Sequence, residues 1–100
     1  MSLSNFFHDA DNDGLVLAYD DELVCCLRKF SCVVAELTGE SLYNERIDAE
    51  QVRVMNESIQ SIDLATVKSI DHELTAEEWL WFQMVWNHHA QQGHCMTSWY

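Results

Sequence analysis

The fold class is decided by residues 75–86, which read TAEEWLWFQMVW. Thr75 is followed three residues later by Glu78, the pattern of a capping box, which predicts that a helix begins here. Nearly every position after it is apolar, and the next glycine is Gly93, so we expect a helix over 76–92. A helix that is apolar on nearly all sides is either central in a core or half of an interface.

Two more helices are expected before this one. Residues 21–38 begin with acids and continue with apolar residues at helical spacing. Residues 48–62 carry a single apolar stripe, and Asp48 with Gln51 forms a second capping-box pattern. Residues 64–71 are ambiguous between a short helix and a strand.

Together these segments predict one domain over residues 1–100, a mainly α bundle of three to four helices. A short N-terminal β-hairpin over residues 6–19 is a further expectation, because an Asp-Gly pair at 13–14 suits a type I′ turn. No apolar run approaches the ~20 residues of a membrane span. The first residues lack the basic start of a secretory signal, and Cys25 next to Cys26 is typical of buried thiols. We therefore expect a cytoplasmic, intracellular protein.

The charge of the chain is strongly unbalanced. Seventeen acidic residues face five basic ones, and the net charge is −12. All five bases lie within residues 28–68. Such a chain repels nucleic acids and anionic membranes and attracts basic surfaces or cations. We expect neither direct nucleic-acid binding nor membrane binding.

Residues 9–20 read DADNDGLVLAYD and resemble the calcium loop of EF-hand and dockerin modules. That loop places oxygen ligands at positions 1, 3, 5 and 12 and a backbone carbonyl at position 7. The resemblance implies a calcium site formed by Asp9, Asp11, Asp13, Asp20 and the carbonyl of Leu15. Two positions depart from the pattern, since Asp20 replaces the Glu of most EF-hands and Leu17 offers no side-chain oxygen. The alternative is an acidic turn that leads into a helix.

Other chemistry has less support in the sequence. Neither Cys25-Cys26 nor His88-His89 has the spacing of paired zinc ligands. The chain contains no nucleophile elbow, phosphate-binding loop, dinucleotide-binding glycine pattern or HExxH motif. We therefore expect a protein that is not an enzyme, with no catalytic residues and no cofactor apart from the calcium that the loop suggests.

The charge leads to the main functional hypothesis, an acidic interaction protein that binds a basic protein surface. It would inhibit a nucleic-acid-handling protein by nucleic-acid mimicry, in the manner of small inhibitors carried by phages and mobile elements. The residues expected to contact the partner are Asp20, Asp21, Glu22, Glu73, Glu77, Glu78, Trp79 and Trp86. The alternatives are the calcium-binding module and a structural homodimer joined through the helix that carries Trp79 and Trp86.

Overall fold

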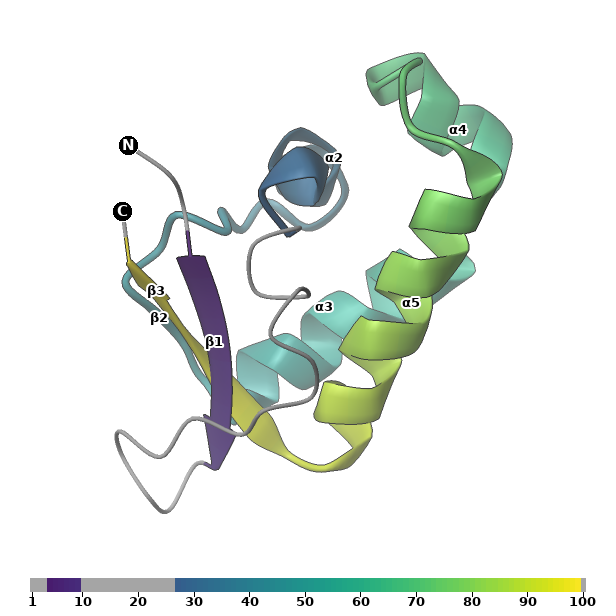
Figure 1. Cartoon of the computed structure of the whole chain (residues 1–100). Coiled ribbons are helices and arrows are strands. Elements are labelled where there is room, and N and C mark those ends of the chain that lie inside the picture. The colour runs from purple at the N-terminus through teal and green to yellow at the C-terminus, as the bar shows by residue number, and fades with distance from the viewer. Residues whose placement is uncertain (1–3, 10–26, 100) are drawn as a thin grey trace.

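The computed structural model describes residues 4–9 and 27–99 (Figure 1). Predictions that fall on other residues lie outside this part of the chain. They are the calcium loop from residue 10 onward, the hairpin turn at residues 13–14, the first six residues of the helix expected over 21–38, the partner contacts at residues 20–22, and the buried thiols at residues 25–26.

A small antiparallel sheet joins segments that are far apart in the sequence (Figure 1). Strand β3 (His94–Trp99) lies in the middle, with β1 (Ser4–Asp9) on one side and β2 (Arg46–Ile47) on the other. Met96 in β3 is in register with one residue of each neighbouring strand. The sheet thereby ties the two ends of the described chain together.

The sheet is the part of the fold that departs from expectation. Strand β1 overlaps the start of the predicted hairpin at residues 6–9, but it pairs with β3 near the other end of the chain. Neither β2 nor β3 is expected from the sequence. Both depend on partners distant in sequence, and such pairing is decided by tertiary context more than by local preference.

The helices confirm a mainly α fold with a short β element. A turn of 3-10 helix, η1 (Leu27–Phe30), leads into α2 (Ser31–Thr38). The remaining helices are α3 (Ala49–Ser61), α4 (Leu64–Ile70) and α5 (Ala76–Gln91). The predictions for α3 and α5 are confirmed to within one residue at each end, and the ambiguous segment 64–71 is helical.

The helix ends test the predicted caps. At the start of α5, Thr75 Oγ1 accepts from the Glu78 amide at 3.1 Å, and Glu78 Oε1 accepts from the Thr75 amide at 3.0 Å. This capping box is confirmed. Asp48 stands at the N-cap of α3, but its side chain accepts no capping hydrogen bond, so the prediction of the second capping box is wrong. Its carboxylate instead accepts from Arg46 Nε at 3.0 Å.

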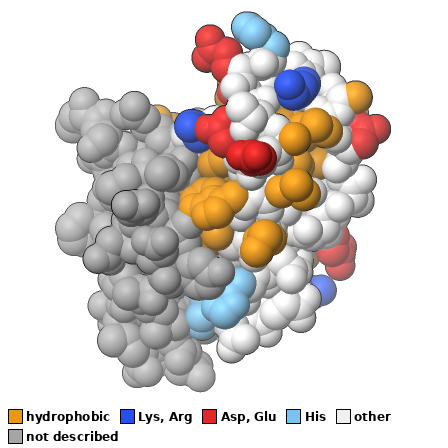
Figure 2. All heavy atoms as spheres, turned by 45° about the vertical axis from the view of Figure 1, so that its right-hand side comes forward, with side chains coloured by type: hydrophobic (Ala, Val, Ile, Leu, Met, Phe, Trp, Pro, Cys, Tyr) orange, Lys and Arg blue, Asp and Glu red, His pale blue; other side chains and the backbone are white. Residues whose placement is uncertain are grey.

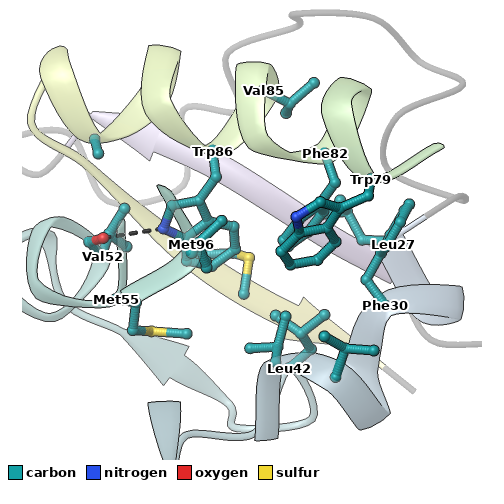
Figure 3. Packing of buried hydrophobic residues seen from close by; sticks show 14 of the residues in the cluster. Leu27, Phe30, Leu42, Val52, Met55, Trp79, Phe82, Val85, Trp86 and Met96 are labelled. Atoms are coloured by element: carbon teal, nitrogen blue, oxygen red, sulfur yellow. Dashed lines mark hydrogen bonds between the residues drawn. The ribbon is translucent and has the colours of Figure 1, made fainter. Parts of the chain in front are cut away.

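The core lies between the sheet and the helices (Figures 1 and 3). Helices α3 and α5 pack against each other, and both contact β3. The largest fully buried side chains include Trp86, Phe30 and Phe82, and every described helix and strand contributes to the same buried cluster. The described elements therefore share one core. None of the helices within the described residues has the length and apolar character needed to cross a membrane.

Candidate functional site on the outer face of helix α5

The inner face of α5 carries its large aromatic side chains. Trp79, Phe82 and Trp86 are at most 2% exposed, and the ring of Phe82 packs against both tryptophans and Phe30 (Figure 3). The Trp86 indole Nε1–H donates to the carbonyl oxygen of Val52 in α3 at 3.0 Å. The expectation that Trp79 and Trp86 contact a partner is wrong for this fold, because both lie in the core. The core interpretation of this helix is the correct one for these residues.

The outer face of α5 is also apolar. Leu80 and Met84 are 58% and 66% exposed, and they lie one helical turn apart on the same face. Trp81, which is half-buried, extends this face, and we name the three residues the outer strip. Hydrophobic side chains gather on this side of the molecule (Figure 2). Elsewhere in the described chain the most exposed large apolar residues are Tyr43 and Val54, each at 41%.

Acidic side chains gather at the N-terminal end of the same helix. Glu73 is exposed in the connection from α4, and Glu77 is exposed in the first turn of α5. Glu78 forms an ion pair with Lys29. The hydrogen bond from Lys29 and the capping bonds to Thr75 lower the pKa of Glu78 to about 2. Within the described chain no base forms an ion pair with Glu73 or Glu77, so both carboxylates remain in solvent beside the outer strip.

A hollow of about 260 Å³ lies where the first turns of α5 meet η1. The described residues that line it are Lys29, Phe30, Glu77, Glu78 and Trp81. The rings of Phe30 and Trp81 are stacked, with centroids 6.1 Å apart. The hollow therefore combines an aromatic wall with a charged rim, and it shares Trp81 with the outer strip.

Most of the basic side chains are neutralised by neighbouring acids. Arg46 lies 3.0 Å from Asp48, and Arg53 lies 2.6 Å from Glu50. The hydrogen bond and the charge of Glu50 raise the pKa of the Arg53 guanidinium. With the pair formed by Lys29, three of the described basic side chains are engaged by carboxylates. The excess of acids is therefore the charge that a partner would meet.

The predicted calcium site is described only at its first residue. Asp9 is the last residue of β1 and is in register with His94. The residues outside the described part are Asp11, Asp13, Leu15 and Asp20 of the loop and Asp21 and Glu22 of the expected partner surface. The segment before the loop is a strand, whereas an EF-hand loop follows a helix. The chain thus departs further from the EF-hand pattern, and calcium binding itself stays a prediction.

Histidines meet where the C-terminal half of α5 approaches the sheet. His89 is 1% exposed, and its ring stacks on Phe7 with centroids 3.9 Å apart. Its Nδ1 lies 2.8 Å from Nδ1 of His94. Burial, together with the nearby His94 and His88, lowers the pKa of His89 to about 3, so this ring is neutral at pH 7. The described residues contain no group of three or more His, Cys, Asp or Glu side chains that could hold a metal ion.

The sequence does not single out the outer strip by its hydrophobicity. Helix α5 is apolar on nearly all sides, so its periodicity does not distinguish the core face from the solvent face. One signal was available, because Glu77, Leu80 and Met84 recur at i, i+3 and i+7. They share a face, and the carboxylate that begins this face favours water over a core.

Comparisons with known proteins identify no relative of this chain. No protein-family model, curated protein or solved structure matches this chain. The function proposed below is therefore inferred from the surface and charge of the chain itself.

Proposed function

We propose that this protein is a non-enzymatic interaction protein that binds a basic surface of another protein through the outer face of α5. The observation that supports this most is the position of the outer strip beside Glu73 and Glu77. Exposed apolar patches bordered by polar residues mark interaction sites. Acids at the border favour a partner of opposite charge.

The apolar residues of the outer strip and the acidic residues contribute differently to such a complex. Leu80 and Met84 are largely exposed, so a partner can remove most of their surface from water. Full burial of such a side chain contributes about 1.5–3 kcal/mol, before the cost of association is subtracted. The flexible side chain of Met84 adapts to different partner shapes. The net charge of −12 increases the rate of encounter with a basic partner. Affinity then comes mainly from the strip, and salt dependence from the acids.

The partner class that fits this charge best is a nucleic-acid-handling protein. Duplex DNA carries one negative charge per ~1.7 Å of its axis, so a groove that holds it is rich in Lys and Arg. An acidic domain anchored beside such a groove competes with the nucleic acid. We therefore propose an inhibitor that acts by mimicry of nucleic acid.

A second copy of the chain is a weaker candidate for the same surface. Leu80 and Met84 could join two copies, as in the homodimer hypothesis. Each copy carries a charge of −12, however, and like charges oppose association. A basic partner relieves this repulsion, and a second copy increases it.

Affinity capture from cells that naturally make the protein tests this proposal. The bait is the wild-type chain, and the comparison is the double variant Leu80→Ser/Met84→Ser. The matched control is Val54→Ser, which changes an exposed apolar residue on α3. We expect basic proteins to be retained by the wild type and the control and lost by the double variant. A captured set that is the same for all three baits would contradict the proposal.

Mimicry has a separate test on the purified partner. A labelled duplex or RNA is bound to the partner, and this protein is then titrated in. We expect the nucleic acid to be released as the complex forms. If a ternary complex forms instead, the protein binds a basic partner without acting as a mimic.

A further inference from the structure

We infer that the hollow between α5 and η1 receives an arginine side chain of the partner. This rests on the proposed function and names the group that would be recognised. The hollow adjoins the outer strip through Trp81, so one partner segment can cover the strip and insert a side chain here. Three properties of the hollow lead to arginine: its size, its aromatic wall and its charge.

The size suits one side chain. The volume of about 260 Å³ lies below the ~300–1,000 Å³ of typical small-molecule pockets. It is also several times the ~30 Å³ that one water molecule occupies. The hollow is therefore small for a cofactor-sized ligand, whereas the end of one long side chain would fit in it.

The aromatic wall suits a planar cation. Trp81 is half-buried, and its ring is stacked on the fully buried Phe30, which restricts its movement. A cation over the face of an indole ring is attracted by the ring's quadrupole. A guanidinium gains more than an ammonium here, because it is planar and stacks on the ring.

The charge at the rim also selects a cation. Lys29 and Glu78 form an ion pair and offset each other. Glu77 adds a carboxylate that forms no ion pair with any described base. A guanidinium stacked on Trp81 would donate a charge-assisted hydrogen bond to Glu77. An anion would be repelled, and a neutral amide would form only a weaker hydrogen bond without the cation–π attraction.

Peptide titration followed by NMR tests this inference without any partner protein. The probe is a blocked Gly-Arg-Gly tripeptide, and the comparison peptides carry lysine or citrulline, the neutral counterpart of arginine. The chain has four tryptophans, and Trp81→Phe assigns the indole N–H signal of Trp81. We expect a saturable shift of this signal with the arginine peptide and clearly weaker responses to the lysine and citrulline peptides.

A pair of charge variants locates the binding. Glu77→Gln should increase the dissociation constant of the arginine peptide by about threefold to tenfold, because one ion pair to the guanidinium is lost. The matched control is Glu45→Gln, which removes the same charge from an exposed residue beside β2 and should leave the dissociation constant unchanged.

Two results would overturn the arginine pocket. One is an equal response to arginine and citrulline, which would indicate that the hollow does not recognise positive charge. The other is an equal effect of Glu77→Gln and Glu45→Gln, which would indicate attraction by the overall charge alone. If either occurs while partner capture still depends on the outer strip, the proposed function stands and only the pocket assignment fails.

Discussion

The two faces of α5 have similar composition and opposite surroundings. Trp79 and Trp86 on one face lie in the core, while Leu80 and Met84 on the other are mostly in solvent. Apolar character alone therefore does not decide burial in this helix. What decides it is the angular position of each residue relative to α3 and the sheet, against which α5 packs. The inner face maintains the fold, and the outer face remains available to a partner.

The largest effect is expected at the centre of the inner face. Trp86→Ala should lower the free energy of unfolding by about 3–5 kcal/mol, because a fully buried indole is replaced by a cavity. Urea unfolding followed by circular dichroism measures this. A loss below about 1 kcal/mol would mean that the inner face is not the core.

A second effect on stability is expected at His89, the buried histidine near the C-terminal end of the inner face of α5. The pKa of His89 is lowered from 6.5 to about 3, so the folded state binds a proton there less readily than the unfolded state. Its contribution to stability is complete above pH 6.5 and is lost as the pH falls towards about 3.

As the pH falls below 6.5, the decrease in the free energy of unfolding approaches about 1.4 kcal/mol per pH unit. Urea unfolding between pH 6.5 and 4.5 measures this loss, because the interval lies above the pKa of 4.5 that Glu78 has in the unfolded chain. His89→Phe should flatten the pH dependence in this interval. An equally steep decline in the variant would show that His89 is not the responsible group.

A smaller difference in stability is expected between variants of the two buried tryptophans. The Trp86 Nε1–H donates to Val52, whereas the Trp79 Nε1 finds no hydrogen-bond partner within the described chain. Trp86→Phe therefore removes a hydrogen bond, and Trp79→Phe removes an unsatisfied donor. We expect Trp86→Phe to be more destabilising by about 1 kcal/mol in urea unfolding. Equal losses would contradict the different environments of the two rings.

The smallest effect on stability is expected on the outer face. Leu80→Ser and Met84→Ser should each change the free energy of unfolding by no more than about 0.5 kcal/mol, since both side chains are mostly exposed. Thermal unfolding of each variant measures this. A loss comparable to that of Trp86→Ala would show that the strip is part of the core.

The sequence predicts the local parts of this fold well. Helices α3 and α5 follow from apolar spacing, and the cap at Thr75 and Glu78 follows from four consecutive residues. The cap at Asp48 fails because its carboxylate binds Arg46 instead. Strands β1 and β3 could not be paired from the sequence, because their partnership depends on how the helices bring the two chain ends together.

The candidate site is predicted only in part. The sequence predicts Glu73, Glu77 and Glu78 at a partner surface. Glu73 lies in the connection before α5, and Glu77 and Glu78 lie in the first turn of this helix. The sequence predicts apolar partner contacts at Trp79 and Trp86, because the size and aromaticity of these residues are typical of an interface anchor. Burial of these two rings follows from packing against α3, β3 and Phe30, which are distant in sequence.

The affinity of the captured partner, measured against salt, tests the central claim most directly. The wild type is compared with Leu80→Ser/Met84→Ser and with Glu73→Gln/Glu77→Gln. We expect the apolar double variant to bind at least about tenfold more weakly at every salt concentration. The acidic double variant should bind more weakly at low salt and show a smaller salt dependence. An affinity that is independent of salt and unchanged in both variants would contradict the assignment of the outer face of α5 to a basic partner.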